Sequence, residues 1–221
     1  GSQPIVEAWN GGTFARPATR VREMAQFLRQ ALAGERVVFR GETFSVDGFR
    51  LTRPPAQPVP IHVAALRPGM LRVAGEVGDG AVLNWLAAED VPKAVGVVRE
   101  AAAQAGRDPA ALEITARVLI YVDPPSPASD LAARRHLTAY LNVPVYQAFH
   151  QWLGRGDALG PMWEAWQRGD RKAAVAAVPE RVINDLIIRG SMDEIRAHVV
   201  RYMDAGIDTA FLQIATGEQD P

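Results

Sequence analysis

One turn of the sequence joins small side chains to the start of a helix, and we expect an anionic group to bind there. Residues 64–69 read Ala-Ala-Leu-Arg-Pro-Gly. Free N–H groups at the start of a helix bind phosphates and carboxylates, and Pro68 is suited to the first helical position. The turn therefore predicts a cofactor site. The alternative is that Ala64 and Ala65 are small only to let the helix pack on its strand.

A strand on each side of a helix must position this turn. Residues 61–65 and 80–85 are short apolar runs typical of buried strands, and Pro68 and Gly78 bound the helix between them. Residues 114–122 and 209–214 are two further apolar runs rich in strand-forming residues. Apolar strands separated by amphipathic helices indicate a parallel sheet, arranged either as a doubly wound sheet or as a (βα) barrel.

The remaining sequence predicts a surface hairpin and several helices. Apolar and polar residues alternate on either side of Gly41-Glu42, which predicts a two-residue turn in a hairpin within residues 34–50. Helical spacing covers residues 19–32 and 87–106, and Ser191 with Glu194 forms a capping box before a final helix. Some 85 mostly helical residues before the last strand are far too many for one crossover.

Composition excludes several classes of partner. Twenty-four basic and 25 acidic side chains nearly cancel, so neither nucleic acid nor an anionic membrane surface is an expected partner. The chain has no cysteine, and it shows neither a membrane-spanning run nor a signal peptide. We therefore expect a cytoplasmic protein that acts on a small molecule.

Several familiar kinds of active site lack their residue patterns. The four histidines share no spacing that would gather a metal, so no metal site is expected. A nucleophile elbow and a glycine-rich dinucleotide fingerprint after a strand are also missing. Hydrolase and Rossmann-type functions are disfavoured accordingly.

Motifs along nearly the whole chain resemble the luciferase-like monooxygenase family, in particular its branch that depends on the deazaflavin coenzyme F-420. They are Ser-Gln-Pro-Ile-Val-Glu-Ala-Trp-Asn at residues 2–10, Ala-Ala-x-x-Pro from Ala64, Ala-Gly-x-x-Gly-Asp-Gly at residues 74–80, and Gly-Ser-Met-Asp-Glu at residues 190–194. The middle two are the most specific.

The resemblance implies a TIM-type (βα)8 barrel with its site at the carboxyl ends of the strands. By this similarity the chain runs from the end of strand 4 to strand 8. Residues 1–221 would then be a single partial barrel domain, roughly the C-terminal half to two-thirds, comprising strands 5–8. A helical insertion after strand 7 would occupy residues 124–190. A partial barrel leaves open strand edges, so we expect completion by a missing N-terminal barrel segment or a homo-oligomer.

The resemblance also implies which residues bind the cofactor, while it names no catalytic residue and no metal ligand. The expected cofactor-binding residues are Ser2, Gln3, Ala64, Ala65, Leu66, Arg67, Pro68, Gly69, Met70, Asn84 and Trp85. Arg67 would contact phosphate or solvent, and Trp85 would border the ring or serve only in packing.

The implied function is an oxidoreductase that transfers hydride between F-420 and an unidentified small organic substrate. One alternative is a luciferase-like monooxygenase that uses flavin mononucleotide (FMN), and another is a shortened flavin-binding barrel without activity. The insertion is rich in aromatic residues that would form either an apolar lid over the site or a small helical core: Tyr140, Tyr146, Phe149, Trp152, Trp163 and Trp166.

Overall fold

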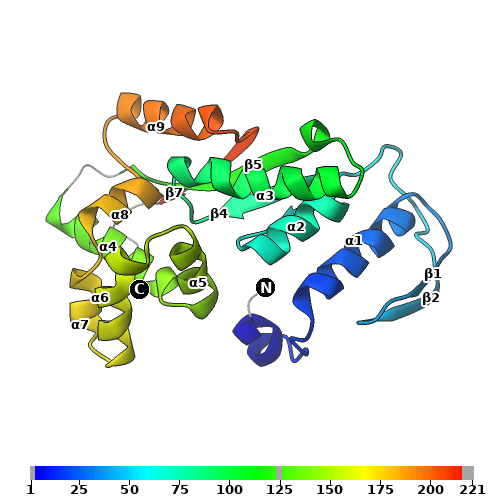
Figure 1. Cartoon of the computed structure of the whole chain (residues 1–221), viewed down its shortest axis with the longest axis horizontal. Coiled ribbons are helices and arrows are strands. Elements are labelled where there is room, and N and C mark those ends of the chain that lie inside the picture. Colours follow the sequence, from blue (N-terminus) through cyan, green and yellow to red (C-terminus); the bar gives the residue numbers. More distant parts are fainter. Residues whose placement is uncertain (1–2, 123–125, 216–221) are drawn as a thin grey trace. The chain divides into compact units, whose positions relative to one another are not determined.

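The structure, a computed structural model, describes residues 3–122 and 126–215 and divides the chain into two compact units. The first unit comprises Gly1–Ala81 and Val97–Leu112, and the second comprises Val82–Gly96 and Glu113–Pro221. Strand β4 (Gly80–Asn84) and helix α3 (Val91–Gln104) each contribute residues to both units (Figure 1).

The first unit carries the predicted turn. Its elements are η1 (Ile5–Trp9), α1 (Pro17–Leu32), β1 (Val37–Arg40), β2 (Ser45–Phe49), β3 (His62–Ala64), α2 (Pro68–Val77) and η3 (Pro109–Ala111). Strands β1 and β2 form an antiparallel hairpin beside α1. The Phe27 ring of α1 holds the hairpin, with centroids 6.3, 5.9 and 5.5 Å from those of Phe39, Phe44 and Phe49.

The turn of this hairpin lies one residue later than the expected Gly41-Glu42. Arg40 pairs with Ser45, and the Gly41 N–H donates to the Phe44 carbonyl (3.0 Å), which leaves Glu42 and Thr43 at the turn. The buried Glu23 carboxylate of α1 accepts hydrogen bonds from the N–H groups of Glu42 (2.5 Å) and Thr43 (3.0 Å). The Thr43 hydroxyl donates to the same carboxylate (2.5 Å), and this hydrogen bond, with those from the two N–H groups, holds the pKa of Glu23 below its usual value. The expectation failed because a residue from another element satisfies the loop's N–H groups.

Helix α2 packs closely against the part of α3 that belongs to the first unit. A Cβ atom on Gly75 would lie 2.2 Å from the Val98 carbonyl oxygen and 2.9 Å from the Ala101 Cβ. Only glycine fits at this distance. This close packing fixes the position of α2 against α3. It therefore also fixes the position of the turn at the start of α2.

Asp79 joins the beginnings of β3 and β4. Its N–H group donates to the Ile61 carbonyl (2.8 Å), and its carboxylate accepts from the Ile61 N–H (2.8 Å) and from Arg29 (3.0 Å). Arg107 lies 3.9 Å from the same carboxylate. Burial acts to raise the pKa of Asp79, but the hydrogen bonds from Ile61 and Arg29 outweigh it and lower the pKa from its ordinary value of 3.8. Asp79 therefore fixes the register at the start of both strands.

The second unit holds most strands of the five-stranded sheet and most of the helices. Besides its part of β4 and α3, it contains η2 (Ala88–Asp90), β5 (Glu113–Tyr121), α4 (Pro127–Leu141), α5 (Pro144–Trp152), α6 (Gly156–Gln167), α7 (Arg171–Ala176), α8 (Glu180–Leu186), β6 (Ile187–Ile188), α9 (Met192–Asp204) and β7 (Thr209–Ala215). Strand β5 pairs in parallel with β7 from Thr115 to Tyr121 and with the short β6 at Leu119 and Ile120. The β6 strand was not predicted, because two residues are too few to form a pattern.

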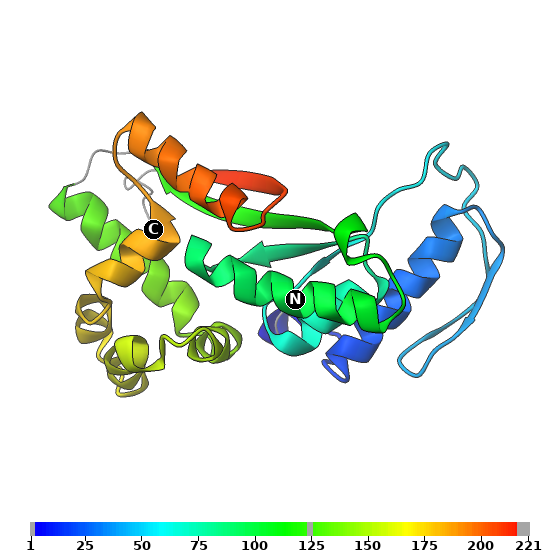
Figure 2. The same cartoon turned by 45° about the horizontal axis from the view of Figure 1, so that its top comes forward.

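Helices α4 to α8 gather into a compact group (Figure 1, Figure 2). Their apolar side chains share one core with the carboxyl end of β5. Trp163 is 5% exposed and donates its indole N–H to the Leu141 carbonyl (2.9 Å). The segment between β5 and α9 is thus a packed layer of helices with its own buried contacts.

All four of the predicted apolar strands are present, as β3, β4, β5 and β7. The predicted capping box also forms at the start of α9, where Ser191 accepts from the Glu194 N–H and Glu194 accepts from the Ser191 N–H (2.7 Å). Over residues 3–122 and 126–215, no helix is long and apolar enough to cross a membrane.

Replacing Asp79 with Asn should destabilise the protein. Hydrogen bonds to a charged group contribute about 1.5–3 kcal/mol, so we expect the free energy of unfolding in urea to fall by about that amount. Asp47→Asn is the matched control, because Asp47 pairs with Arg40 on the surface with 77% of its side chain exposed. Equal losses of stability in the two variants would contradict the role assigned to Asp79.

His150 should make the stability of the protein fall in acid. Its side chain is fully buried on α5, and burial, followed by the nearby Arg155 charge, lowers its pKa from 6.5 to about 3. Below pH 6.5 the His150 side chain is protonated in the unfolded chain but stays neutral in the folded chain. The folded state therefore loses up to about 1.4 kcal/mol per pH unit as the pH falls from 6.5 toward 3.

The variant His150→Leu should lose this part of the pH dependence. Urea unfolding between pH 4 and pH 7 measures the slope for both proteins. Identical slopes would show that the buried histidine does not resist protonation.

Candidate functional site

The turn between β3 and α2 presents an open helix start. Arg67 is in an extended conformation (φ −99°, ψ 162°) at the N-cap position, and no side chain caps the helix. The N–H groups of Met70 and Leu71 donate to the Arg67 carbonyl (3.0 Å), whereas the Gly69 N–H has no acceptor in the described part of the chain. A Cβ atom on Gly69 would meet nothing within 4 Å, so the space beside the first turn is open. A phosphate group can approach this helix start.

The alanines of the turn have different surroundings. Ala65 is 3% exposed and is part of the core, whereas Ala64 is exposed. The alternative that a small side chain is needed only for packing therefore fits Ala65 and does not fit Ala64. Among the other predicted residues, Arg67 and Gly69 are exposed, and Leu66, Pro68 and Met70 are partly buried.

In the N-terminal segment, the predicted residue Gln3 makes a hydrogen bond within its own loop. Ser2 lies outside the described residues. The Gln3 amide donates to the Glu7 carboxylate (2.9 Å), which also accepts from the Phe14 N–H (3.4 Å). Glu7 thus orders its own loop, and cofactor contact by Gln3 stays a prediction.

Asn84 and Trp85 lie at the carboxyl end of β4, in the second unit, where they meet Arg117 of β5. The Arg117 Nε donates to the Asn84 Oδ1 at 3.0 Å, and the Arg117 Cζ lies 5.5 Å from the Trp85 ring centroid. Trp85 is 4% exposed, and its φ of 55° is in the left-handed region that disfavours a bulky side chain. Such backbone strain occurs most often at functional sites.

Three residues of the helical segment and β5 extend this cluster. The ring centroids of Tyr140 and His136 lie 4.7 and 5.5 Å from that of Trp85. The Tyr121 hydroxyl is 2.9 Å from the His136 Nδ1. Burial and then the Arg117 charge lower the pKa of His136, so this imidazole is neutral at pH 7. A neutral imidazole that is hydrogen-bonded to a phenol hydroxyl can accept or release a proton.

The six aromatic residues of the insertion have different surroundings. Trp163 is buried in the helical core, Trp166 and Tyr146 pack against that core, and Trp152 stacks on the buried Phe149. Tyr140 is 37% exposed beside Trp85, and its ring centroid lies 6.0 Å from that of the half-buried Tyr146. A role for these two rings in a lid over the site stays a prediction.

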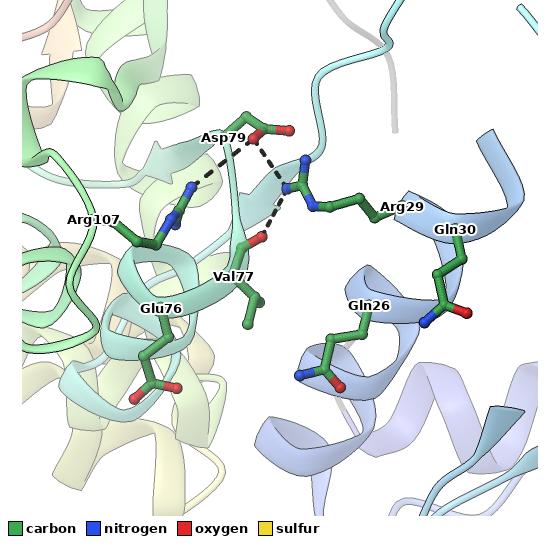
Figure 3. A pocket seen from close by; sticks show the side chains of 7 residues that line it. All are labelled: Gln26, Arg29, Gln30, Glu76, Val77, Asp79 and Arg107. Carbon is green, nitrogen blue, oxygen red and sulfur yellow. Dashed lines mark hydrogen bonds and ion pairs between the residues drawn. The ribbon is translucent and has the colours of Figure 1, made fainter. Parts of the chain in front are cut away.

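A polar pocket of about 490 Å³ in the first unit is a weaker candidate (Figure 3). It is lined by Gln26, Arg29, Gln30, Glu76, Val77, Asp79 and Arg107. The two arginines point toward Asp79, and Arg29 also donates to the Val77 carbonyl (3.0 Å). The Gly78-Asp79-Gly80 motif therefore has a structural role, and the charges of the pocket compensate one another.

Sequence reasoning missed Arg117, Tyr121 and His136. One signal could have found Arg117, because it is the one charged residue in the apolar run of residues 114–122. A charged side chain is unfavourable on a strand whose two faces are both covered. Such a residue therefore indicates a role for its charge. Across residues 3–122 and 126–215, no three side chains of the metal-binding types gather as a metal site would require.

Comparison with known proteins identifies the family. The model of the luciferase-like monooxygenase family matches residues 1–209. The 5,10-methylenetetrahydromethanopterin reductases of Archaeoglobus fulgidus and Methanolobus tindarius are 26% and 27% identical over 89% and 94% of this chain. An F-420-dependent glucose-6-phosphate dehydrogenase of Gordonia bronchialis is 33% identical over 50% of the chain. The chain spans 60% and 63% of the length of the two reductases.

Solved structures show the same fold. The F-420-dependent tetrahydromethanopterin reductase of Methanopyrus kandleri superposes with a TM-score of 0.73 at 23% identity, over 93% of this chain and 59% of its own. An F-420-dependent secondary alcohol dehydrogenase gives a TM-score of 0.70 at 20% identity, over 95% and 60%. The fold and family predicted from the sequence are confirmed. The chain belongs to the luciferase-like monooxygenase family.

Proposed function

We propose that the protein is an oxidoreductase that binds coenzyme F-420 and transfers hydride between it and a small organic substrate. Several relatives at 26–34% identity are named as F-420-dependent dehydrogenases or as methylenetetrahydromethanopterin reductases. The structural observation that carries the proposal is the open start of α2, where an uncapped helix and Gly69 leave room for a phosphate.

The residues present suit a deazaflavin. The start of α2 has no side-chain cap and is open to a phosphate, and Asn84 and Trp85 lie at the carboxyl end of β4. When bound, the coenzyme would supply the ring carbon that gives or takes hydride.

Each segment has a separate task in this proposal. Residues 64–70 hold the phosphate through backbone N–H groups, with Arg67 as an exposed cation beside them. Asn84 and Trp85 border the cofactor, and the Tyr121–His136 pair holds a proton for the substrate. The substrate itself is a small organic molecule.

The binding of F-420 can be tested with a pair of variants at one position. Gly69 has open space around its Cβ position, so both Gly69→Ala and Gly69→Asp fit sterically, and Asp is favourable in the first turn of a helix. Repulsion between Asp and a phosphate should weaken F-420 binding at least about 10-fold in Gly69→Asp, while Gly69→Ala should bind like the unmodified protein.

Fluorescence titration of the whole protein with F-420 measures these affinities, and FMN serves as the competing cofactor. Tighter binding of FMN would favour the monooxygenase alternative. Binding of neither cofactor would contradict the proposed function and favour a barrel without activity. Equal F-420 affinities of Gly69→Asp and Gly69→Ala would show that the phosphate does not bind at this turn.

A further inference from the structure

Arg117 differs in its partners from Arg155 and Arg189, two other partly buried arginines of the second unit. Arg155 pairs with Asp90 at 2.7 Å, with 13% of its side chain exposed. Arg189, with 11% exposed, pairs with Asp130. Arg117 is also partly buried, but in the part of the chain that the structure describes it has no carboxylate partner. Its one hydrogen-bond acceptor here is the neutral Asn84 amide oxygen.

A partly buried cation without a counterion is unfavourable, and the neighbours of Arg117 do not neutralise it. Stacking over the Trp85 ring gives a cation–π contact, which compensates only a small part of the lost hydration. The charge still acts on the groups around it. It lowers the pKa of His136 and opposes the burial that raises the pKa of Tyr146. The position is therefore electrically positive.

A second group beside it also lacks a partner. The Trp85 indole N–H is buried and unpaired in the described structure, although nearly all buried N–H groups in proteins are hydrogen-bonded. The Trp85 backbone is held in the left-handed region. A strained residue thus presents an unused donor next to an uncompensated cation. One acceptor group with a negative charge would satisfy both.

We propose that Arg117 and the Trp85 indole N–H bind the anionic group, carboxylate or phosphate, of the substrate. Tyr140 and Tyr146 would then contact its organic part, since Tyr140 lies against Trp85 and Tyr146 lies next to Tyr140. The substrate would be an organic anion. The assignment of this anion to the substrate rests on the proposed function, whereas the anion site itself does not.

The test follows the indole N–H signals of the ¹⁵N-labelled protein during titration with benzoate and with inorganic phosphate at constant ionic strength. The Trp85 signal is identified by its loss in Trp85→Phe. We expect it to shift saturably with at least one of the two anions, and the preferred anion shows whether the site takes carboxylate or phosphate. In Arg117→Met the affinity should fall at least about 10-fold, because a charge-assisted hydrogen bond is lost.

Arg171→Met is the matched control. Arg171 also stacks on a tryptophan, with its Cζ 3.6 Å from the Trp166 ring centroid, but away from Trp85. This variant should leave the shift of the Trp85 signal unchanged. Arg117→Met should remain folded with an equal or higher melting temperature, because it removes a charge without a counterion.

Three results would overturn the proposal. The first is a Trp85 signal that neither anion moves. The second is an unchanged anion affinity in Arg117→Met together with a lower melting temperature, which would make Arg117 a structural residue. The third is loss of F-420 binding in Arg117→Met, which would assign the anion to the cofactor. Anion binding in a protein that fails to bind F-420 would instead keep the anion site and refute the proposed function.

Discussion

The Arg117 guanidinium lies partly buried on β5, a strand whose other central residues are apolar, and the candidate site is arranged around it. Asn84 accepts its hydrogen bond, and Trp85 lies beneath it with a left-handed backbone. Its charge helps to keep His136 neutral. Removing a cation from water is unfavourable unless something compensates it. The uncompensated charge beside the carboxyl end of β4 is the basis of the proposed anion site.

In the first unit the corresponding charged residue is Asp79. Its negative charge is compensated by neighbouring arginines and by a backbone N–H group. Asp79 receives the Ile61 N–H and the Arg29 guanidinium, and Arg107 lies nearby. This arrangement fixes the start of β3, while the close approach at Gly75 fixes α2. Between them, the turn of residues 64–70 can remain open, because its position does not depend on a side-chain cap. A compensated charge thus supports the structure here, whereas the uncompensated charge in the second unit points to a ligand.

Much of the fold could be predicted from local sequence patterns. The apolar run of residues 114–122 predicted β5, and Ser191 with Glu194 predicted the start of α9, because both signals lie within one element. The family was recognised from short motifs around the turn. What failed depended on residues that meet only in the folded chain. Glu23 reshapes a hairpin loop that lies some 20 residues away.

The candidate site shows the same limit. Asn84 and Trp85 were predicted from the resemblance, but their partners Arg117 and His136 lie 32 and more residues further along the chain. The aromatic residues of the insertion were visible in the sequence, yet only tertiary packing separates Trp163, which is in a core, from Tyr140, which lies beside Trp85. Spacing along the chain carries no information about such contacts.

Hydrogen–deuterium exchange of the whole protein, with and without F-420, tests the central claim most directly. Cofactor binding at the proposed segments predicts slower exchange in the peptide covering residues 64–71 and in the peptide covering residues 83–87, with no such effect from FMN at the same concentration. Unchanged exchange in both peptides at a saturating concentration of F-420, or protection confined to the pocket around Asp79, would contradict it.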